Sequence, residues 1–250
     1  MTEPSAAAEG CRLVTNGTES APGSAVGDQT APPGDLPAAV LWDMDGTLVD
    51  TEPYWIDTEH ALADEYGGTW STAHAMNLVG NSLIDSARYI KEHMGVPLPP
   101  EEIVDRLLDG VVSRVEDEVP WRPGARELLQ ALAESGVRCA LVTMSYERFV
   151  APILAQLPPE TFRVIVTGDQ VEFGKPHPEP YLTAAAALGV RPEDCVAIED
   201  SNTGAKSAEA AGCTVLVVEN HVPILDGPRR VFRDSLEGLA PADLGAMRIR

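Results

Sequence analysis

Short apolar runs alternate with amphipathic stretches along most of the chain. Five runs have the length and the apolar, largely β-branched composition of buried strands, at 38–42, 137–143, 163–167, 195–198 and 213–218. Between them Ala and Leu recur at spacings of three and four, which predicts helices at 124–135, 147–156, 179–188 and 203–211. Helix C-caps are expected at Gly136, Gly189 and Gly212. The alternation of strand and helix predicts an α/β fold with a parallel, doubly wound sheet.

The stretch from 52 to 119 departs from this alternation. Its apolar positions follow a helical period over three segments, 54–66, 82–93 and 100–118, and no run within it is typical of a strand. The next five residues, Pro-Trp-Arg-Pro-Gly at 120–124, have the composition of a hinge. We therefore predict a helical insertion at 52–119 in a core domain formed by 38–51 and 120–240.

The two ends of the chain show neither period. Residues 1–37 are rich in Ala, Gly, Ser, Thr and Pro, a composition that buries too little apolar surface to fold. We predict a disordered N-terminal tail over this range and a C-terminal tail at 241–250.

Charge and cysteine usage limit the classes of partner. The formal net charge of the 250 residues is −21, with 18 Lys and Arg against 39 Asp and Glu, and such a field repels nucleic acids and anionic membranes. An anionic substrate would need a local cation or metal ion. The four scattered cysteines form neither a zinc motif nor a disulfide framework. Without an apolar run of about 18 residues or a secretory signal, we expect a cytoplasmic protein with no protein partner evident from the sequence.

Two pairs of carboxylates follow predicted strands. Asp43 and Asp45 come directly after the first strand, and Glu199 and Asp200 follow a later one. The carboxyl ends of parallel strands meet at one crevice, so these acids should gather there. A Mg²⁺ ion would balance their charge, with Asp43 and Asp200 as ligands. The alternative for an isolated pair of this kind is an ordinary acidic turn.

Two further residues complete the predicted crevice. Thr143 follows another strand, where its hydroxyl and the backbone N–H groups beside it, including that of Met144, suit a phosphoryl oxygen. Lys175 lies between Gly174 and Pro176 and is one of few cations in an acidic chain. Judged singly, the threonine is uninformative and the lysine could be a solvated loop residue.

These four segments, in this order and spacing, resemble the motifs of the haloacid dehalogenase superfamily. The segment Asp-Met-Asp-Gly-Thr at 43–47 is similar to its first motif, and Thr143, Lys175 and the pair at 199–200 are similar to the other three. The resemblance covers about 38–239. Its details are similar to the β-phosphoglucomutases and sugar phosphatases of that superfamily. It implies a Rossmann-like, doubly wound core with an inserted α-helical cap domain at 52–119.

The resemblance also implies a mechanism. Asp43 attacks phosphorus to give an aspartyl-phosphate, and Asp45 protonates the leaving oxygen and later activates water. Mg²⁺ is bound by Asp43, Asp200 and the backbone carbonyl of Asp45, while Glu199 ligates it directly or through water. Thr143, Met144 and Lys175 hold the phosphoryl group. We therefore expect a Mg²⁺-dependent phosphatase of a small phosphorylated metabolite, such as a sugar phosphate.

Two departures from the β-phosphoglucomutase pattern favour hydrolysis over mutase activity. Leu83 stands where those enzymes carry an Arg for a second phosphate, and Trp55 stands where they carry a cap histidine. The candidates for substrate contact in the cap are Trp55, Asn81, Ser82 and Arg88. A phosphosugar mutase is the alternative activity, and a non-catalytic binding protein on the same fold is the remote one.

Overall fold

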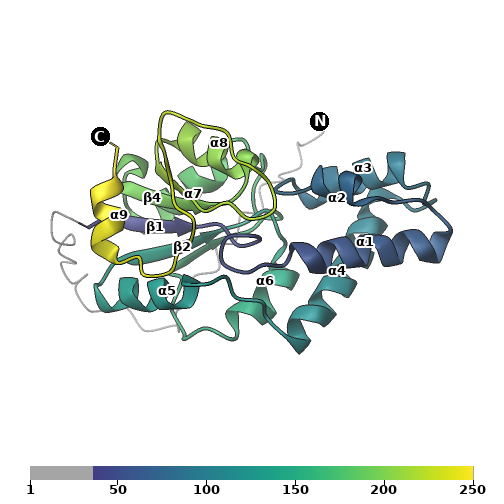
Figure 1. Cartoon of the computed structure of the whole chain (residues 1–250), viewed down its shortest axis with the longest axis horizontal. Helices are drawn as coiled ribbons and strands as arrows, with labels where there is room; N and C mark the ends of the chain where they lie inside the picture. The colour runs from purple at the N-terminus through teal and green to yellow at the C-terminus, as the bar shows by residue number, and fades with distance from the viewer. Residues whose placement is uncertain (1–35, 250) are drawn as a thin grey trace, which may run out of the picture.

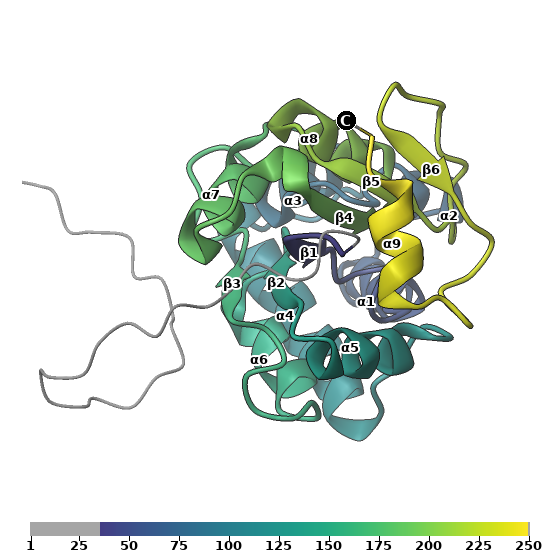
Figure 2. The ribbon, with the colours of Figure 1, turned by 90° about the vertical axis from the view of Figure 1, so that its left-hand side faces the viewer.

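A computed structural model describes residues 36–249, and these form a parallel sheet with helices on both faces (Figures 1 and 2). The strand order is β3 (Val164–Val166), β2 (Arg138–Val142), β1 (Ala39–Trp42), β4 (Cys195–Glu199), β5 (Thr214–Val217) and β6 (Arg230–Phe232). Central β1 pairs with β2 and β4, so that Trp42 lies opposite Leu141 on one side and Ile198 on the other. The predicted α/β fold with a doubly wound parallel sheet is confirmed.

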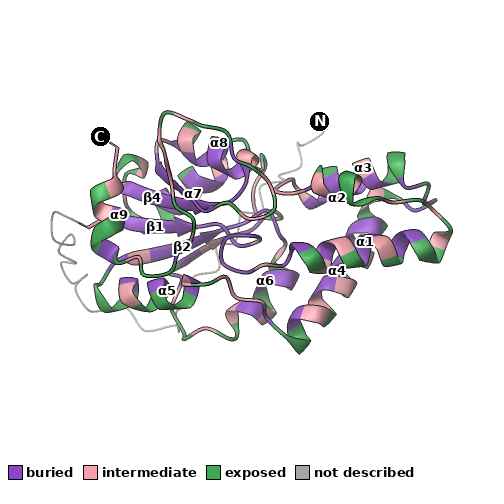
Figure 3. Cartoon of the chain, viewed as in Figure 1, coloured by how far each residue is buried: buried purple, intermediate pink, exposed green. Residues whose placement is uncertain are grey.

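The two faces of β1 contribute to different hydrophobic cores. Ala39 and Leu41 pack with the helices α7 (Glu179–Leu188) and α8 (Asn202–Ala211). Val40 and Trp42 face the opposite core, which contains side chains of α5 (Ala125–Glu134), α6 (Glu147–Leu154) and α9 (Pro241–Met247). Successive strand residues point to opposite faces, and a strand covered on both faces is therefore apolar throughout. All four residues of β1 are buried, as Figure 3 shows by colour.

Four helices lie beyond the carboxyl ends of the strands (Figure 1). They are α1 (Glu52–Tyr66), α2 (Thr72–Met76), α3 (Leu83–His93) and α4 (Pro100–Asp117). Helix α4 packs against α1 and α3 within this group and against α6 of the sheet region. We retain the division into a core and a cap at 52–119 as a proposal. Among the described residues, no helix combines the length and apolar character needed to cross a membrane.

The two connections between these regions pair with each other. Val49 and Trp121 form an antiparallel bridge, and the Asp50 N–H donates to the Pro120 carbonyl at 2.7 Å. The Asp50 carboxylate also accepts a hydrogen bond from Asn220 Nδ2 at 2.9 Å. Two segments that are hydrogen-bonded to each other therefore join the cap-side helices to the sheet, near the carboxyl ends of the strands.

Most predicted elements are present, and three differences stand out. Each of the five predicted strands overlaps an observed strand, and β4 ends one residue later than predicted, whereas β6 and the five-residue α2 were not predicted. The segment expected as a C-terminal tail forms α9 instead, because Leu244 is fully buried against the core. A 3₁₀ turn, η1 (Pro192–Asp194), leads into β4. The predicted disordered tail at 1–37 lies outside the described residues except for its last two positions.

Candidate functional site

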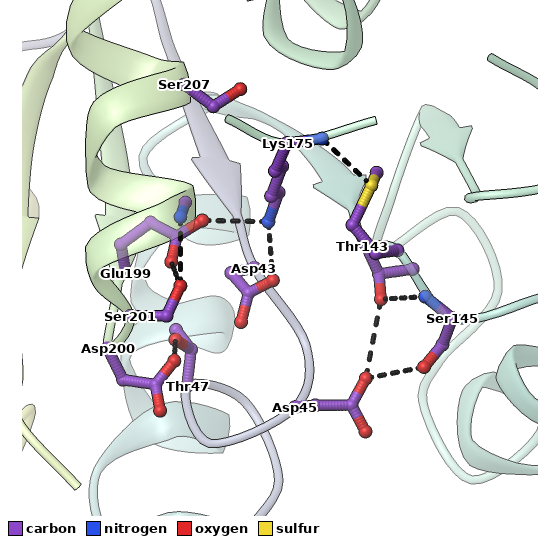
Figure 4. A network of polar contacts seen from close by, with 12 residues as sticks. Asp43, Asp45, Thr47, Thr143, Ser145, Lys175, Glu199, Asp200, Ser201 and Ser207 are labelled. Carbon is purple, nitrogen blue, oxygen red and sulfur yellow. Dashed lines mark hydrogen bonds and ion pairs between the residues drawn. The ribbon is translucent and has the colours of Figure 1, made fainter. Parts of the chain in front are cut away.

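A buried ion pair joins the ends of β1 and β4 (Figure 4). Lys175 Nζ lies 2.6 Å from Asp43 Oδ1 and 2.7 Å from Glu199 Oε1, and all three side chains are buried. Asp43 directly follows β1, Glu199 ends β4, and the lysine precedes α7. The parallel strands thus bring together charges that are 132 and 24 residues apart in the chain.

Further hydrogen-bond donors hold Glu199 in this cluster. The Tyr181 hydroxyl donates to Glu199 Oε1 at 2.5 Å, and the Ser201 hydroxyl donates to Oε2 at 3.1 Å. Gly204 leaves room for the carboxylate, because a Cβ there would lie 1.9 Å from Glu199 Oε1. Each oxygen of Glu199 therefore has a protein donor, and this residue fixes the position of Lys175.

Asp200 is less completely satisfied than its neighbour. Thr47 Oγ1 donates to Asp200 Oδ1 at 3.2 Å, whereas the buried Oδ2 has no hydrogen-bond partner within residues 36–249. The first-motif loop passes so close that a Cβ on Gly46 would lie 1.9 Å from Oδ2, and the φ of Gly46 is +86°. Only glycine accommodates both the approach and the backbone conformation. A buried carboxylate oxygen without a donor calls for a ligand.

The cluster carries more negative than positive charge. Burial raises the pKa of Asp43 to about 7, Glu199 and Asp45 add to the rise, and Lys175 opposes it. Burial, with the charges of Asp43 and Glu199, also raises the pKa of Asp200 well above its ordinary value. The pKa of Lys175 is raised by the two carboxylates despite its burial, so the ammonium remains charged. Neutralising the excess negative charge of the cluster requires protons or a cation.

The residues present fit a divalent cation. Oxygen atoms of Asp43, Glu199 and Asp200 lie within 4.8 Å of one another, and carboxylates are the usual protein ligands of Mg²⁺. Among the described residues, the oxygen without a partner belongs to Asp200, while both oxygens of Glu199 are engaged by lysine, tyrosine and serine. The donor set therefore favours Asp43 and Asp200 as direct ligands.

Asp45 points away from this cluster toward a different set of donors (Figure 4). Its Oδ1 accepts hydrogen bonds from Thr51 Oγ1 at 2.6 Å and from Trp55 Nε1 at 3.2 Å. Its Oδ2 accepts from Ser145 Oγ at 2.7 Å and lies 3.4 Å from Thr143 Oγ1. Two acids separated by one residue thus have distinct environments, one beside a lysine and the other among neutral donors.

The remaining phosphate-binding candidates lie beside the same cleft. Thr143 Oγ1 accepts a hydrogen bond from the Ser145 N–H at 3.0 Å. The Lys175 N–H donates to Met144 Sδ at 3.1 Å, so the methionine side chain supports the lysine loop. Both residues line the cleft together with the lysine.

The four cap candidates divide into two pairs. Trp55 and Asn81 line the cleft. Ser82 instead accepts a hydrogen bond from the Asp85 N–H at the start of α3, and Arg88 is an exposed residue paired with Asp85 at 2.8 Å. Ser82 and Arg88 do not line the cleft, because their side chains serve the helix on which they lie.

Several residues of the site were missed from the sequence. Thr51 and Ser145 hold Asp45, Tyr181 holds Glu199, and Glu52 and Glu59 line the cap side of the cleft. Two of them, Thr51 and Glu52, lie within five residues of the first-motif segment 43–47. Glutamates that share a helix face with apolar residues such as Trp55 and Leu62 were a usable signal, because Glu is rarely buried without a partner.

The chain matches one family model and many known proteins. The model of haloacid dehalogenase-like hydrolases matches residues 40–218. Hexitol phosphatase B of Escherichia coli K12 is 31% identical over 215 residues, which cover 82% of this chain and 96% of that protein. Phosphoglycolate phosphatase of Salmonella typhi is 34% identical over 231 residues, covering 81% and 91%.

A solved structure gives the same result for the fold. CbbY from Rhodobacter sphaeroides in complex with phosphate superimposes with a TM-score of 0.74 at 28% identity. The match covers 83% of this chain and all of that one. The similarity therefore extends over both the sheet and the helices beyond the strand ends.

Proposed function

The chain belongs to the haloacid dehalogenase-like hydrolase family and is a phosphoric monoester hydrolase, and we propose that it releases phosphate from small phosphorylated metabolites through a covalent intermediate on Asp43. One observation carries this proposal. Asp43 and Asp45 lie two residues apart at one strand end, yet one pairs with Lys175 and the other with neutral donors. Such a division suits a nucleophile and a proton-transfer group, which must act differently in one site.

In the first step Asp43 attacks phosphorus. A bond forms between its carboxylate oxygen and phosphorus, and the bond from phosphorus to the leaving oxygen breaks. Lys175, 2.6 Å from Asp43, supplies positive charge beside the transferring group. The hydroxyl of Thr143 and the backbone N–H groups that follow it complete the phosphoryl site.

Asp45 is the proposed general acid and base. It gives a proton to the leaving oxygen in the first step and takes one from water when the aspartyl-phosphate is hydrolysed. Thr51 and Trp55 approach its carboxyl group from the cap side, and Ser145 approaches from the sheet side. This support on both sides would hold the group between the phosphoryl site and the space for the leaving group.

Mg²⁺ is the proposed cofactor, held by Asp43, Asp200 and the backbone carbonyl of Asp45. When bound, it neutralises charge between an anionic nucleophile and an anionic phosphate. The unpartnered Asp200 Oδ2 supports this assignment. Glu199 would act by holding Lys175 and would reach the metal only through water, since its oxygens already have donors.

Water is the proposed acceptor of the phosphoryl group. Leu83 is buried and offers no charge to a second phosphate, and Trp55 donates to Asp45 where a mutase would carry a histidine. The similar proteins of the comparison include a hexitol phosphatase and a phosphoglycolate phosphatase. These features together favour a phosphatase over a phosphosugar mutase.

Replacement of the nucleophile tests this proposal. With para-nitrophenyl phosphate and Mg²⁺, Asp43→Asn should lower kcat by at least about 10⁴-fold, because the attacking carboxylate is gone. Asp57→Asn makes the same change at an exposed position of α1 and should leave kcat within about twofold. A rate in Asp43→Asn comparable to wild type would exclude Asp43 as nucleophile.

Thermal unfolding tests the metal site without relying on activity. Mg²⁺ at 100 times its dissociation constant should stabilise the wild-type protein by about 2.7 kcal/mol. Asp200→Asn should remove most of this stabilisation, whereas Asp226→Asn, at an exposed position, should retain it. An unchanged Mg²⁺ effect in Asp200→Asn would contradict the ligand assignment.

A further inference from the structure

The cap side of the cleft is acidic. Helix α1 contributes Glu52 and Glu59, which are 7% and 4% exposed and line the same cleft as Asp43 and Asp45. They are seven residues apart, two turns of helix, and therefore share one face of α1. Lys175 is the single cationic side chain among the described residues that line this cleft.

These two glutamates have few partners of their own. The Glu52 carboxylate accepts no hydrogen bond from any residue between 36 and 249, although it is more than nine-tenths buried. Glu59 accepts one, from Trp70 Nε1 to Oε2 at 2.8 Å. No oxygen of either glutamate is among the fully enclosed, donorless atoms of residues 36–249, so these oxygens reach the cleft, where an occupant can supply donors.

The distribution of charge restricts what that occupant can carry. The Lys175 ammonium is already shared between Asp43 and Glu199. A leaving group with a carboxylate or a second phosphate would therefore face Glu52 and Glu59 without a countercharge. A leaving group with several hydroxyls would instead supply the missing donors.

We propose that the cleft selects monophosphates whose leaving group is an uncharged polyol, with Glu52 and Glu59 accepting hydrogen bonds from its hydroxyls, and that it rejects anionic leaving groups. This inference rests on the proposed function, because it concerns the group that departs from phosphorus. Ser86, which lines the cleft and is buried on α3, adds a hydroxyl on the same side.

Protonated forms of Glu52 and Glu59 are compatible with a polyol as the occupant. Burial raises the pKa of Glu52 to about 8, with the charges of Asp45 and Glu59 adding to it. Burial likewise raises the pKa of Glu59 to about 7, against the Trp70 hydrogen bond. Near neutral pH these groups are partly protonated, and a carboxyl group in that form can both accept from and donate to hydroxyls. An ammonium group would favour the ionised form of both carboxylates, and phosphoethanolamine tests that occupant.

Paired variants and four substrates test the inference. The substrates are sorbitol 6-phosphate, 2-phosphoglycolate, phosphoethanolamine and para-nitrophenyl phosphate. Glu→Leu removes the acceptor at position 52 or 59, Glu→Gln removes only the charge, and Glu92→Gln is the matched control at an exposed position of α3. Thermal unfolding of each variant establishes that it is folded.

The wild-type kcat/KM should be at least about tenfold higher for sorbitol 6-phosphate than for 2-phosphoglycolate or phosphoethanolamine. Glu52→Leu should lower it about tenfold for sorbitol 6-phosphate, chiefly through KM, and by a smaller factor for the aryl phosphate, whose leaving group is not a polyol. Glu52→Gln should restore most of the polyol activity and raise kcat/KM for 2-phosphoglycolate several-fold.

Four outcomes would overturn the inference. One is a wild-type preference for 2-phosphoglycolate or phosphoethanolamine. Another is an equal loss on all substrates in Glu52→Leu and Glu59→Leu, which would indicate a structural role. Turnover of the aryl phosphate that depends on Asp43, without preference for the polyol, would refute this inference alone. No turnover of any substrate would refute the proposed function with it.

Discussion

The sheet side and the cap side of the cleft both bury carboxylates, but the two sides differ in the hydrogen-bond and ion-pair partners that they provide for them. At the strand ends, Asp43 and Glu199 share a lysine, and hydroxyl donors satisfy Glu199 further. On α1, Glu52 has no donor among the described residues and Glu59 has one indole. The difference teaches that protein groups already position Asp43 and Glu199, whereas Glu52, like Asp200 Oδ2 at the proposed metal site, has no donor among the described residues.

Asp45 connects the two sides. Its donors come from the sheet side through Ser145 and from the start of the cap through Thr51 and Trp55. Donors from both sides of the cleft therefore complete the environment of the proposed proton-transfer group. This arrangement would couple the chemistry to the presence of the cap.

Among the changes that test this contrast, removal of the shared cation should have the largest effect. Lys175→Met keeps a side chain of similar length but leaves Asp43 and Glu199 without positive charge. We expect kcat for the aryl phosphate to fall about 10³-fold and the free energy of unfolding to fall by roughly 3 kcal/mol. Steady-state kinetics and urea unfolding measure the two effects.

The matched control is Lys206→Met, at an exposed position of α8, which should change kcat by less than about twofold. If Lys175→Met retained kcat within tenfold of wild type, the view of a preorganised sheet side would be wrong.

The cap side should respond in the opposite direction in stability. The pKa of Glu52 is raised in the folded state to about 8 from 4.5, so the folded protein binds this proton more tightly. The free energy of unfolding should therefore fall as pH rises from 4.5 to 8. Glu52→Gln cannot ionise, so its free energy of unfolding should not fall in this way. At pH 8.5 without metal the variant should be more stable than wild type by about 2 kcal/mol.

Urea unfolding at pH 5 and at pH 8.5 measures this effect, and the gain should be small at the lower pH because Glu52 is protonated in the folded protein there. Glu92→Gln should show no such pH-dependent gain. An equal stability of Glu52→Gln and wild type at pH 8.5 would mean that Glu52 has donors in solution, and the contrast between the two sides would disappear.

The sequence was sufficient to predict strands β1 to β5 because strands that are buried on both faces of a sheet are apolar throughout. A strand such as β1 is then apolar throughout and recognisable by composition alone. The edge strand β6 contains Arg230 and is only half buried, and α2 has five residues, so neither has a clear period. Helix α9 was missed because its burial through Leu244 depends on the distant core.

The same distinction applies to the site. Asp43, Glu199 and Asp200 could be placed together because parallel strands end at one edge of a sheet. The donors around them could not, because Tyr181 and Ser145 lie on a helix and a loop whose orientation follows from packing. The cap candidate Arg88 pairs with Asp85 three residues earlier and is not among the residues that line the cleft.

Two tryptophans offer the most selective test of the contrast. Trp55 Nε1 donates to Asp45 and Trp70 Nε1 donates to Glu59. Trp55→Phe and Trp70→Phe remove one indole donor each while keeping an aromatic ring, and the edge contact between Trp55 and Phe149 can be retained. The two variants thus alter one carboxylate on each side of the cleft.

Trp55→Phe should lower kcat for the aryl phosphate about tenfold with little change in KM, because Asp45 loses a donor that positions it. Trp70→Phe should leave that kcat within about twofold and change KM for sorbitol 6-phosphate instead. A change in KM alone for Trp55→Phe would make it a substrate contact. Because Asp45 keeps Thr51 and Ser145 in either variant, a loss greater than about 10³-fold would indicate a wider rearrangement of the cap than one missing donor explains.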